Sequence, residues 1–333
     1  MADTDSAHKV LSAEERAAIF TGIDSVPGSA KPDPVMVVDN ISRSFGGLKA
    51  VDVAHLEIQR GCITGLIGPN GAGKTTFFNL ITGFDRPDTG SWTMDGTDFH
   101  TQRPHQVARK GVVRTFQLTK ALSKMTVLEN VRLGASHQTG ERMLNALLPF
   151  TWRKQEAEIT ERAHAMLARF KLDAKADDMA GSLSGGQRKL LEMARALMSD
   201  PKVVMLDEPM AGVNPALTQS LLEHVKSLRD DGMTVVFVEH DMDVIREISD
   251  WVVVMAQGSV IAESRPDELS SNTAVVDAYL GSHHDQALEF DDEGNPTGAT
   301  AELAEQIEAA EAETLESGGD LSEDPGTIEG SKS

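Results

Sequence analysis

The stretch of sequence that decides the fold is Gly68-Pro69-Asn70-Gly71-Ala72-Gly73-Lys74-Thr75-Thr76. It fits the phosphate-loop pattern GxxxxGK(S/T), whose glycines let successive backbone N–H groups converge on one anion. An apolar run, residues 63–67, precedes the loop and a helical pattern follows it, as this kind of site requires. We expect Lys74 to reach the β- and γ-phosphates of a nucleotide and the Thr75 hydroxyl to bind Mg²⁺. The alternative, a glycine-rich turn that holds a lysine by chance, is disfavoured by this context.

Two carboxylates follow a second apolar run farther along the chain. Residues 203–206 are apolar throughout, and Asp207 and Glu208 come directly after them. Since ligands bind at the carboxyl ends of strands in open α/β sheets, we expect both side chains beside the phosphate loop. Asp207 would hold Mg²⁺, mostly through water, and Glu208 would orient and polarise the attacking water. An apolar run ending in Asp-Glu is a weak signal alone, and it becomes strong behind a phosphate loop.

The most specific segment of the chain reads Leu183-Ser184-Gly185-Gly186-Gln187. Ser184 and Gln187 have the S-x-x-Q spacing of a capping box, so Ser184 is predicted to begin a helix with bare glycine amides in its first turn. Such a helix end is a second anion-binding element, although an ordinary helix start fits the same spacing. A second phosphate-binding element this far from the first makes sense if two chains complete each other's site.

The remaining apolar runs indicate the fold class. Residues 203–206, 234–238 and 251–255 are continuous apolar runs, typical of strands buried on both faces of a parallel sheet. They alternate with helical patterns, and residues 126–175 are helical by composition. We therefore predict an α/β fold without internal repeats.

Charge divides the chain into unequal parts. Its 52 acidic and 31 basic side chains give a net charge of −21, and residues 282–333 alone carry 15 acids and one base. Without a basic cluster the chain is a poor candidate for binding nucleic acid. One cysteine, Cys62, excludes an internal disulfide and suits a reducing compartment. We expect a cytosolic protein, since no apolar run is long enough to span a bilayer and the first residues do not resemble a signal peptide.

These features predict three segments. Residues 1–34 form an extension with a short helix and a Pro/Gly/Ser linker, expected to be partly disordered. Residues 35–281 form the body that contains the phosphate loop, the two carboxylates and the Leu183–Gln187 segment. Residues 282–333 hold a single aromatic residue and are expected to be a disordered acidic tail, either solubilising or an interaction arm.

Together, the phosphate loop, the two carboxylates and the Leu183–Gln187 segment resemble the ATP-binding subunits of ATP-binding cassette (ABC) transporters across residues 35–281. The resemblance implies that residues 35–281 form an ABC ATPase domain: a P-loop NTPase with a RecA-like parallel-sheet core, an antiparallel β-subdomain and an α-helical signature subdomain at about 118–200. It also implies that the phosphate loop of one subunit and the signature of another clamp ATP between them, head to tail. ATP and Mg²⁺ are the expected cofactors.

Three further residues take roles from this resemblance. Phe45 resembles the aromatic residue that stacks on adenine, and Gln117 resembles the glutamine that senses Mg²⁺ and links to the permease. His240 resembles the switch histidine that contacts the γ-phosphate. Taken alone, each has a simpler interpretation: a core aromatic residue, a solvated loop residue and a strand-end histidine. Their order along the chain, among the stronger motifs, favours the functional roles.

The loop after Glu208 departs from the commonest family pattern, because Asn214 stands where an aspartate is usual. Gly-Val-Asn-Pro at 212–215, together with residues 111–117, 125–131 and 239–242, resembles importers of branched-chain amino acids. Importers of urea and amides share much of this pattern. A non-transport ABC ATPase is the other alternative, although chromosome-maintenance members insert a long coiled coil where this chain has only about 110 residues.

The expected partners follow from the resemblance. They are a second ATPase subunit, identical or related, arranged head to tail, and integral membrane permease subunits. A periplasmic or extracellular substrate-binding protein would act indirectly, and no nucleic-acid partner is expected. The chain would then work as a peripheral protein at the cytoplasmic face of the cell membrane. Because an ATPase subunit does not touch the cargo, the substrate rests on analogy.

Overall fold

The computed structural model describes residues 10–115, 122–136, 138 and 152–283. The chain divides into two units, Met1–Leu280 and Gly281–Ser333, and the architecture below belongs to the first. Gln117 and residues 284–333 lie outside the described residues. The expectation of a disordered acidic tail therefore stays a prediction.

A six-stranded sheet forms the core, in the order β10-β9-β3-β8-β7-β6. Neighbouring strands from β6 to β9 run parallel, and β10 pairs antiparallel with β9 at one edge. The apolar runs of the sequence become its central strands, each buried on both faces. This confirms the predicted α/β architecture with a parallel core sheet. The strands are β3 (Ile63–Ile67), β6 (Val112–Arg114), β7 (Val203–Asp207), β8 (Thr234–Val238), β9 (Trp251–Ala256) and β10 (Ser259–Ser264).

A second, antiparallel sheet has the order β2-β1-β4-β5, as the family resemblance implied. Together with α2 it covers one face of the core sheet, while α7, α8 and α9 cover the other. Side chains of the core strands alternate between the two hydrophobic clusters, so that Leu206 and Met205 belong to different clusters. The strands are β1 (Pro34–Phe45), β2 (Leu48–Gln59), β4 (Thr89–Met94) and β5 (Thr97–Asp98).

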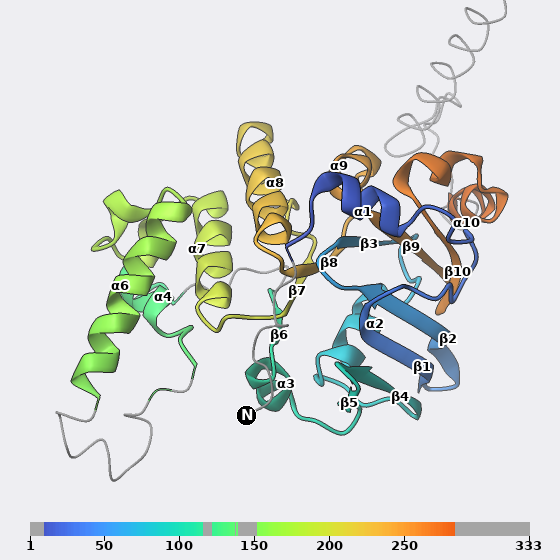
Figure 1. The fold of residues 1–333 in the computed structure, drawn as a ribbon, viewed down its shortest axis with the longest axis horizontal. Helices are drawn as coiled ribbons and strands as arrows, with labels where there is room; N and C mark the ends of the chain where they lie inside the picture. Colours follow the sequence, from blue (N-terminus) through green and yellow to red (C-terminus); the bar gives the residue numbers. More distant parts are fainter. Residues whose placement is uncertain (1–9, 116–121, 137, 139–151, 284–333) are drawn as a thin grey trace, which may run out of the picture. The chain divides into compact units, whose positions relative to one another are not determined.

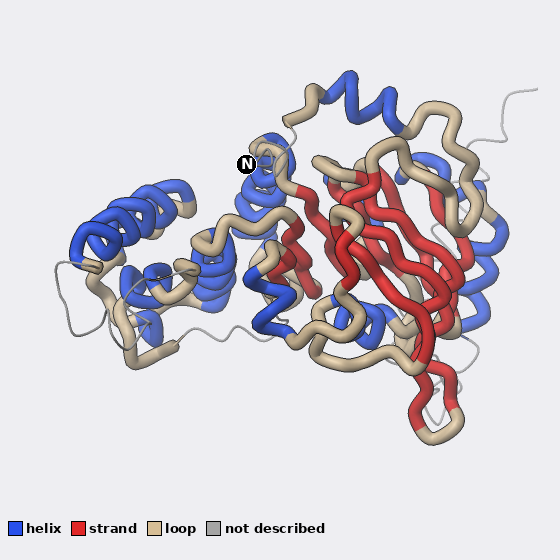
Figure 2. The backbone as a smooth tube through the Cα atoms, turned by 60° about the horizontal axis from the view of Figure 1, so that its bottom comes forward, coloured by secondary structure: helices blue, strands red, loops and turns tan. Residues whose placement is uncertain are grey.

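Helices α4, α6 and α7 form a group of their own, linked by mutual contacts and drawn to one side in Figure 1. Figure 2 shows the strands gathered in one block with helices on either side of them. The helices are α1 (Ala13–Ile19), α2 (Lys74–Ile81), α3 (Pro104–Arg109), α4 (Val127–Arg132), α6 (Arg153–Arg169), α7 (Gly185–Leu197), α8 (Pro215–Asp230), α9 (Met242–Ile248) and α10 (Thr273–His283), with 3₁₀ turns at Asp173–Lys175, Ala180–Ser182 and Pro266–Ser271. Within the described residues, no helix is long and apolar enough to cross a membrane.

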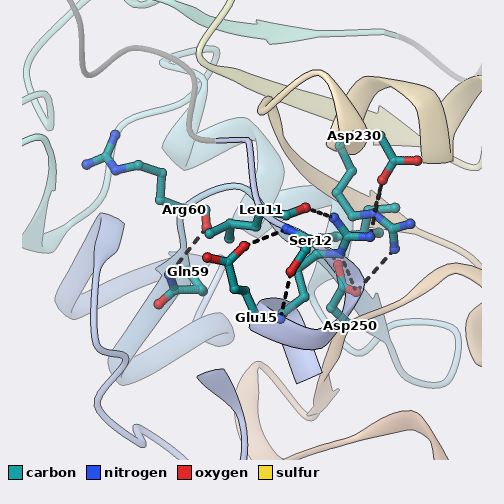
Figure 3. A network of polar contacts seen from close by, with 10 residues as sticks. Leu11, Ser12, Glu15, Gln59, Arg60, Asp230 and Asp250 are labelled. Carbon is teal, nitrogen blue, oxygen red and sulfur yellow. Dashed lines mark hydrogen bonds and ion pairs between the residues drawn. The ribbon is translucent and has the colours of Figure 1, made fainter. Parts of the chain in front are cut away.

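The N-terminal helix α1 packs against the body. A capping box between Ser12 and Glu15 begins it, and the guanidinium of the buried Arg16 lies 3.3 Å from Asp230 and 3.8 Å from Asp250 (Figure 3). Phe20, just after the helix, stacks on Trp251 with ring centroids 5.0 Å apart. The first 34 residues thus contain an ordered element that joins the core.

Residues 26–34, interpreted as a linker, are anchored by a buried ion pair. The Lys31 ammonium donates to Glu263 at 2.8 Å, and both side chains are almost fully buried. The same carboxylate accepts from the indole N–H of Trp251 and from the backbone N–H of Gly28. Because every group in this network has a partner, removal of one would leave a buried charge uncompensated.

Candidate nucleotide-binding site

The phosphate loop lies between β3 and α2, as the sequence predicts. Two of its glycines are required by close backbone packing. A Cβ on Gly68 would stand 2.0 Å from the carbonyl oxygen of Met255, and one on Gly73 would stand 2.3 Å from that of Ala50. Gly73 is also the N-cap of α2, with a φ of 97° that side chains rarely adopt. The loop therefore holds its shape only with glycine at both positions.

Lys74 is folded back over this loop. Its Nζ donates to the carbonyl oxygens of Gly68 at 2.5 Å and Pro69 at 3.0 Å. Burial lowers the pKa of this ammonium, although the negative charges of Glu208 and Asp207 oppose the shift. The ammonium thus lies near both carboxylates that the sequence analysis paired with the loop.

A pocket of about 510 Å³ opens at the carboxyl ends of the core strands. It brings the phosphate loop together with Glu208 and His240, which come from positions more than 130 residues later in the chain. Several predicted site residues do not line it: Phe45, Gly68, Pro69, Asp207 and the signature residues Ser184, Gly185, Gly186 and Gln187. Its lining residues are Leu48, Lys49, Ala50, Asn70, Gly71, Ala72, Gly73, Lys74, Thr75, Thr76, Glu208, His240 and Gln257.

Glu208 and His240 meet because they follow neighbouring strands. The backbone N–H of Glu208 donates to Val238 at 3.0 Å, and its carboxylate lies 2.9 Å from the Nε2 of His240. Glu208 has a φ of +46°, an uncommon conformation for a residue with a side chain. The half-exposed histidine ring and the partly buried carboxylate thus form a pair at the wall of the pocket.

Asp207 lies behind this wall, held by a residue that the sequence analysis missed. The Arg114 guanidinium donates to Asp207 at 2.5 Å and to the side-chain oxygen of Asn79, on α2, at 2.6 Å. Both members of the ion pair are nearly buried. The sequence signals a role for Arg114 only through its position, three residues before Gln117.

The oxygen atoms near the pocket suit Mg²⁺. The Thr75 hydroxyl and the Asp207 carboxylate are hard ligands of the kind this ion prefers. Among the described residues, no group of three or more His, Cys, Asp or Glu side chains has the geometry of a metal site. Mg²⁺ in nucleotide sites relies instead on one or two protein ligands together with phosphate oxygens, so this donor set fits it.

The signature segment forms the capping box that its spacing predicts. The Ser184 hydroxyl accepts from the backbone N–H of Gln187 at 3.3 Å, and the Gln187 side chain accepts from the backbone N–H of Ser184 at 3.0 Å. The two glycines differ from each other. A Cβ on Gly185 would meet no atom within 4 Å, whereas one on the buried Gly186 would stand 1.7 Å from the side chain of Leu217. Of the two glycines, Gly185 is exposed, whereas Gly186 is buried and lets α7 pack closely against Leu217 of α8.

Two more charged residues, also missed from the sequence, hold the loop after Glu208. Lys189 of α7 donates to the carbonyl oxygens of Glu208, Pro209 and Ala211 at 3.3, 2.8 and 2.5 Å. Glu239 accepts from the backbone N–H of Met210 at 2.8 Å. Burial lowers the pKa of Lys189 and raises that of Glu239, each opposed by local hydrogen bonds or charges. Neither residue belongs to a pattern that reveals these distant contacts.

Phe45 and Asn214 occupy exposed positions. The Phe45 ring is 48% exposed and lies 4.7 Å from the guanidinium of Arg43. Leu48, which the sequence did not suggest as a site residue, lines the pocket and is 73% exposed. Asn214 is the N-cap of α8 and accepts from the backbone N–H of Leu217 at 3.2 Å. The asparagine thus keeps a capping function at the position where it departs from the family pattern.

A phosphate loop and a carboxylate–histidine pair at the carboxyl ends of a parallel sheet, with a separate glycine-containing helix start, define an ATPase of the ABC type. A family model described as ABC transporter matches residues 51–211. The probable branched-chain amino acid transport ATP-binding protein LivG of Archaeoglobus fulgidus is 45% identical over 247 residues, or 74% of this chain and 95% of that protein. The chain therefore belongs to the family of ABC transporter ATP-binding proteins.

Further relatives agree in sequence and structure. The high-affinity branched-chain amino acid transport ATP-binding protein BraF of Pseudomonas aeruginosa is 39% identical over 250 residues, covering 74% of this chain and 98% of that protein. The ADP conformation of MJ1267, an ATP-binding cassette of an ABC transporter, is 39% identical with a TM-score of 0.65, and the match covers 74% of this chain and 99% of that one. The ATP-binding cassette MJ0796, in a dimeric post-hydrolysis state with ADP and Pi, is 25% identical with a TM-score of 0.58, and the match covers 69% of this chain and 98% of that one.

Proposed function

We propose that this ABC ATPase powers the uptake of branched-chain amino acids through a membrane permease. The observation that carries the ATPase mechanism is the pocket in which the phosphate loop faces Glu208 and His240. The cargo is supported by the curated relatives, which are named as branched-chain amino acid transport proteins at 39–45% identity.

The residues of the pocket take distinct parts in this proposal. The backbone amides of the phosphate loop and Lys74 bind the phosphates, and Lys74 exchanges its bonds to carbonyl oxygens for bonds to phosphate oxygens. Thr75, Asp207 and Gln117 would hold Mg²⁺, and the ion would neutralise charge on the phosphates. Glu208 orients the attacking water, and His240, beside it, contacts the γ-phosphate.

A second subunit, identical or related, completes the site. Two observations support this arrangement: the signature does not line the pocket of its own chain, and Gly185 leaves open space at the start of α7. The backbone amides at the start of α7 would approach the γ-phosphate of the ATP bound to the partner's phosphate loop. In each subunit, Phe45 would stack on the adenine of the ATP bound to the phosphate loop of the same chain. Closure over two nucleotides would drive permease subunits, to which a substrate-binding protein delivers cargo. The ATPase would work peripherally at the cytoplasmic face of the membrane.

Uptake measurements test the proposal. Cells whose chromosomal genes for this transporter are deleted receive the transporter with either the wild-type chain or the Glu208→Gln chain. Uptake of labelled leucine is then compared with uptake of labelled urea and of labelled acetamide. We expect leucine uptake with the wild type, and its loss with Glu208→Gln although the purified variant still binds ATP. Uptake of urea or acetamide instead of leucine would reject the cargo. Wild-type hydrolysis by Glu208→Gln in the assembled complex would reject the role of Glu208.

A further inference from the structure

The segment that follows Glu208 has its polar backbone groups satisfied from two directions. The ammonium of Lys189 reaches it from α7 and donates to the carbonyl oxygens of Glu208, Pro209 and Ala211. Pro209 is buried, so its carbonyl oxygen needs a donor from the protein, and the same ammonium also reaches the oxygens of the partly buried Glu208 and the exposed Ala211. One side chain of the signature helix thereby fixes the backbone on both sides of Met210.

Glu239 provides the acceptor that backbone N–H groups of this region need, whereas Lys189 provides donors for the carbonyl oxygens. Its carboxylate, only 5% exposed, accepts from the backbone N–H of Met210 at 2.8 Å and from that of His240 at 3.4 Å. It therefore connects the segment after Glu208 to the residue that the Glu208 carboxylate contacts. Lys189 and Glu239 also attract each other electrostatically across the segment.

The conformation of Glu208 explains why such fixation matters. With a φ of +46°, its backbone lies in the left-handed region, which persists in residues with a side chain only when the surroundings enforce it. The Lys189 bond to the Glu208 carbonyl oxygen, at 3.3 Å, acts on the strained residue itself. The orientation of the Glu208 carboxylate thus depends on contacts made outside the pocket.

We propose that Lys189 and Glu239 are positioning residues that hold residues 208–211 so that the carboxylate of Glu208 stays beside His240. The proposal rests on the roles of Glu208 and His240 given above. Lys189 lies four residues after Gly185 on the same face of α7, so a shift of this helix moves the Glu208 backbone as well. The helix end that approaches the partner's nucleotide is thereby tied to the carboxylate that acts on the chain's own nucleotide.

The test compares Lys189→Met and Lys189→Arg with the wild-type chain in the assembled transporter. Methionine keeps the aliphatic stem and loses the donors, so we expect kcat to fall about a hundredfold, the cost of a small misplacement of a catalytic group. Affinity for ATP, measured with a fluorescent analogue on the full-length chain, should stay within about twofold because the phosphate loop is untouched. Arginine supplies donors again and should restore most of kcat. Lys226→Met, which removes a surface lysine paired with Glu247, is the matched control and should behave as wild type.

Glu239→Gln and Glu239→Ala give a second, independent measurement. Glutamine keeps an acceptor for the Met210 amide and should retain most of kcat, whereas alanine should lower kcat with ATP affinity unchanged. Wild-type kcat in both Lys189→Met and Glu239→Ala, with Glu208→Gln inactive, would overturn the positioning role alone. A parallel fall in ATP affinity and kcat would also overturn it, since it would indicate a general structural role. Hydrolysis by Glu208→Gln would instead overturn the proposed function.

Discussion

The N-termini of α2 and α7 are the two helix ends proposed to bind phosphate, and they are built in opposite ways. Helix α2 begins at Gly73, which has a left-handed backbone and no side-chain cap. Helix α7 begins at Ser184 with a complete capping box. The first end depends on backbone packing against distant residues, such as Ala50 and Met255. The second depends on contacts between residues three positions apart.

This difference indicates how the two ends are used. The end of α2 leaves its amides without side-chain partners and faces a pocket that already contains Glu208 and His240. The end of α7 is held by a capping box within its own chain and is exposed at Gly185, so its first turn does not need a ligand to form. A preformed, outward-facing helix end suits a surface that must meet another subunit, whereas an uncapped end within a pocket suits direct phosphate binding.

Lys74→Met should produce the largest effect, because it acts on the end that binds nucleotide within its own chain. Loss of the ammonium removes charge-assisted hydrogen bonds of about 1.5–3 kcal/mol each, so ATP affinity should fall about tenfold to a hundredfold and hydrolysis should be lost. Titration of the full-length chain with a fluorescent ATP analogue measures the affinity, with Lys226→Met as the control lysine. Unchanged affinity would show that Lys74 keeps its bonds to Gly68 and Pro69 when nucleotide binds.

Ser184→Arg should affect the start of α7 and leave nucleotide binding at the start of α2 unchanged. The arginine would fill the open space beside Gly185 and should lower hydrolysis in the assembled transporter about a hundredfold, a loss typical for removal of transition-state hydrogen-bond donors. Binding of ATP to the isolated full-length chain should not change, since Ser184 does not line the pocket. Loss of binding by the isolated chain would contradict the proposal that the signature acts on the partner's nucleotide.

What the sequence predicted of the site follows the same division. The capping box of Ser184 and the phosphate loop involve residues close together in the chain, and both could be read from spacing. The central strands were equally accessible because Val203–Asp207 and Thr234–Val238 are apolar throughout. The meeting of the phosphate loop with Glu208 could be predicted from the general placement of strand ends, but pairings between individual distant side chains could not. Arg114 pairs with Asp207 across 93 positions, and no local pattern records that choice of partner.

The N-terminal extension shows the same limit at the level of the fold. Its Pro/Gly/Ser composition suggested a linker, yet Lys31 is buried against Glu263, 232 positions away. Burial of a lysine depends on a carboxylate that is placed only by the folded sheet. The short helix before it could be predicted because an amphipathic pattern is local, and in the structure the Ser12–Glu15 capping box that begins it is local too.

Ser184→Ala is the mildest test of the comparison, because it removes only the cap of α7. Loss of an N-cap serine should lower the free energy of unfolding by about 1 kcal/mol. Ser12→Ala provides the matched control, since Ser12 and Glu15 form the same capping box at the start of α1. Both variants should lose similar stability in urea denaturation, but only Ser184→Ala should slow ATP hydrolysis by the assembled transporter. Equal hydrolysis in the two variants would mean that the cap of α7 only stabilises the helix. A selective loss would show that its rigidity serves the nucleotide of the second subunit.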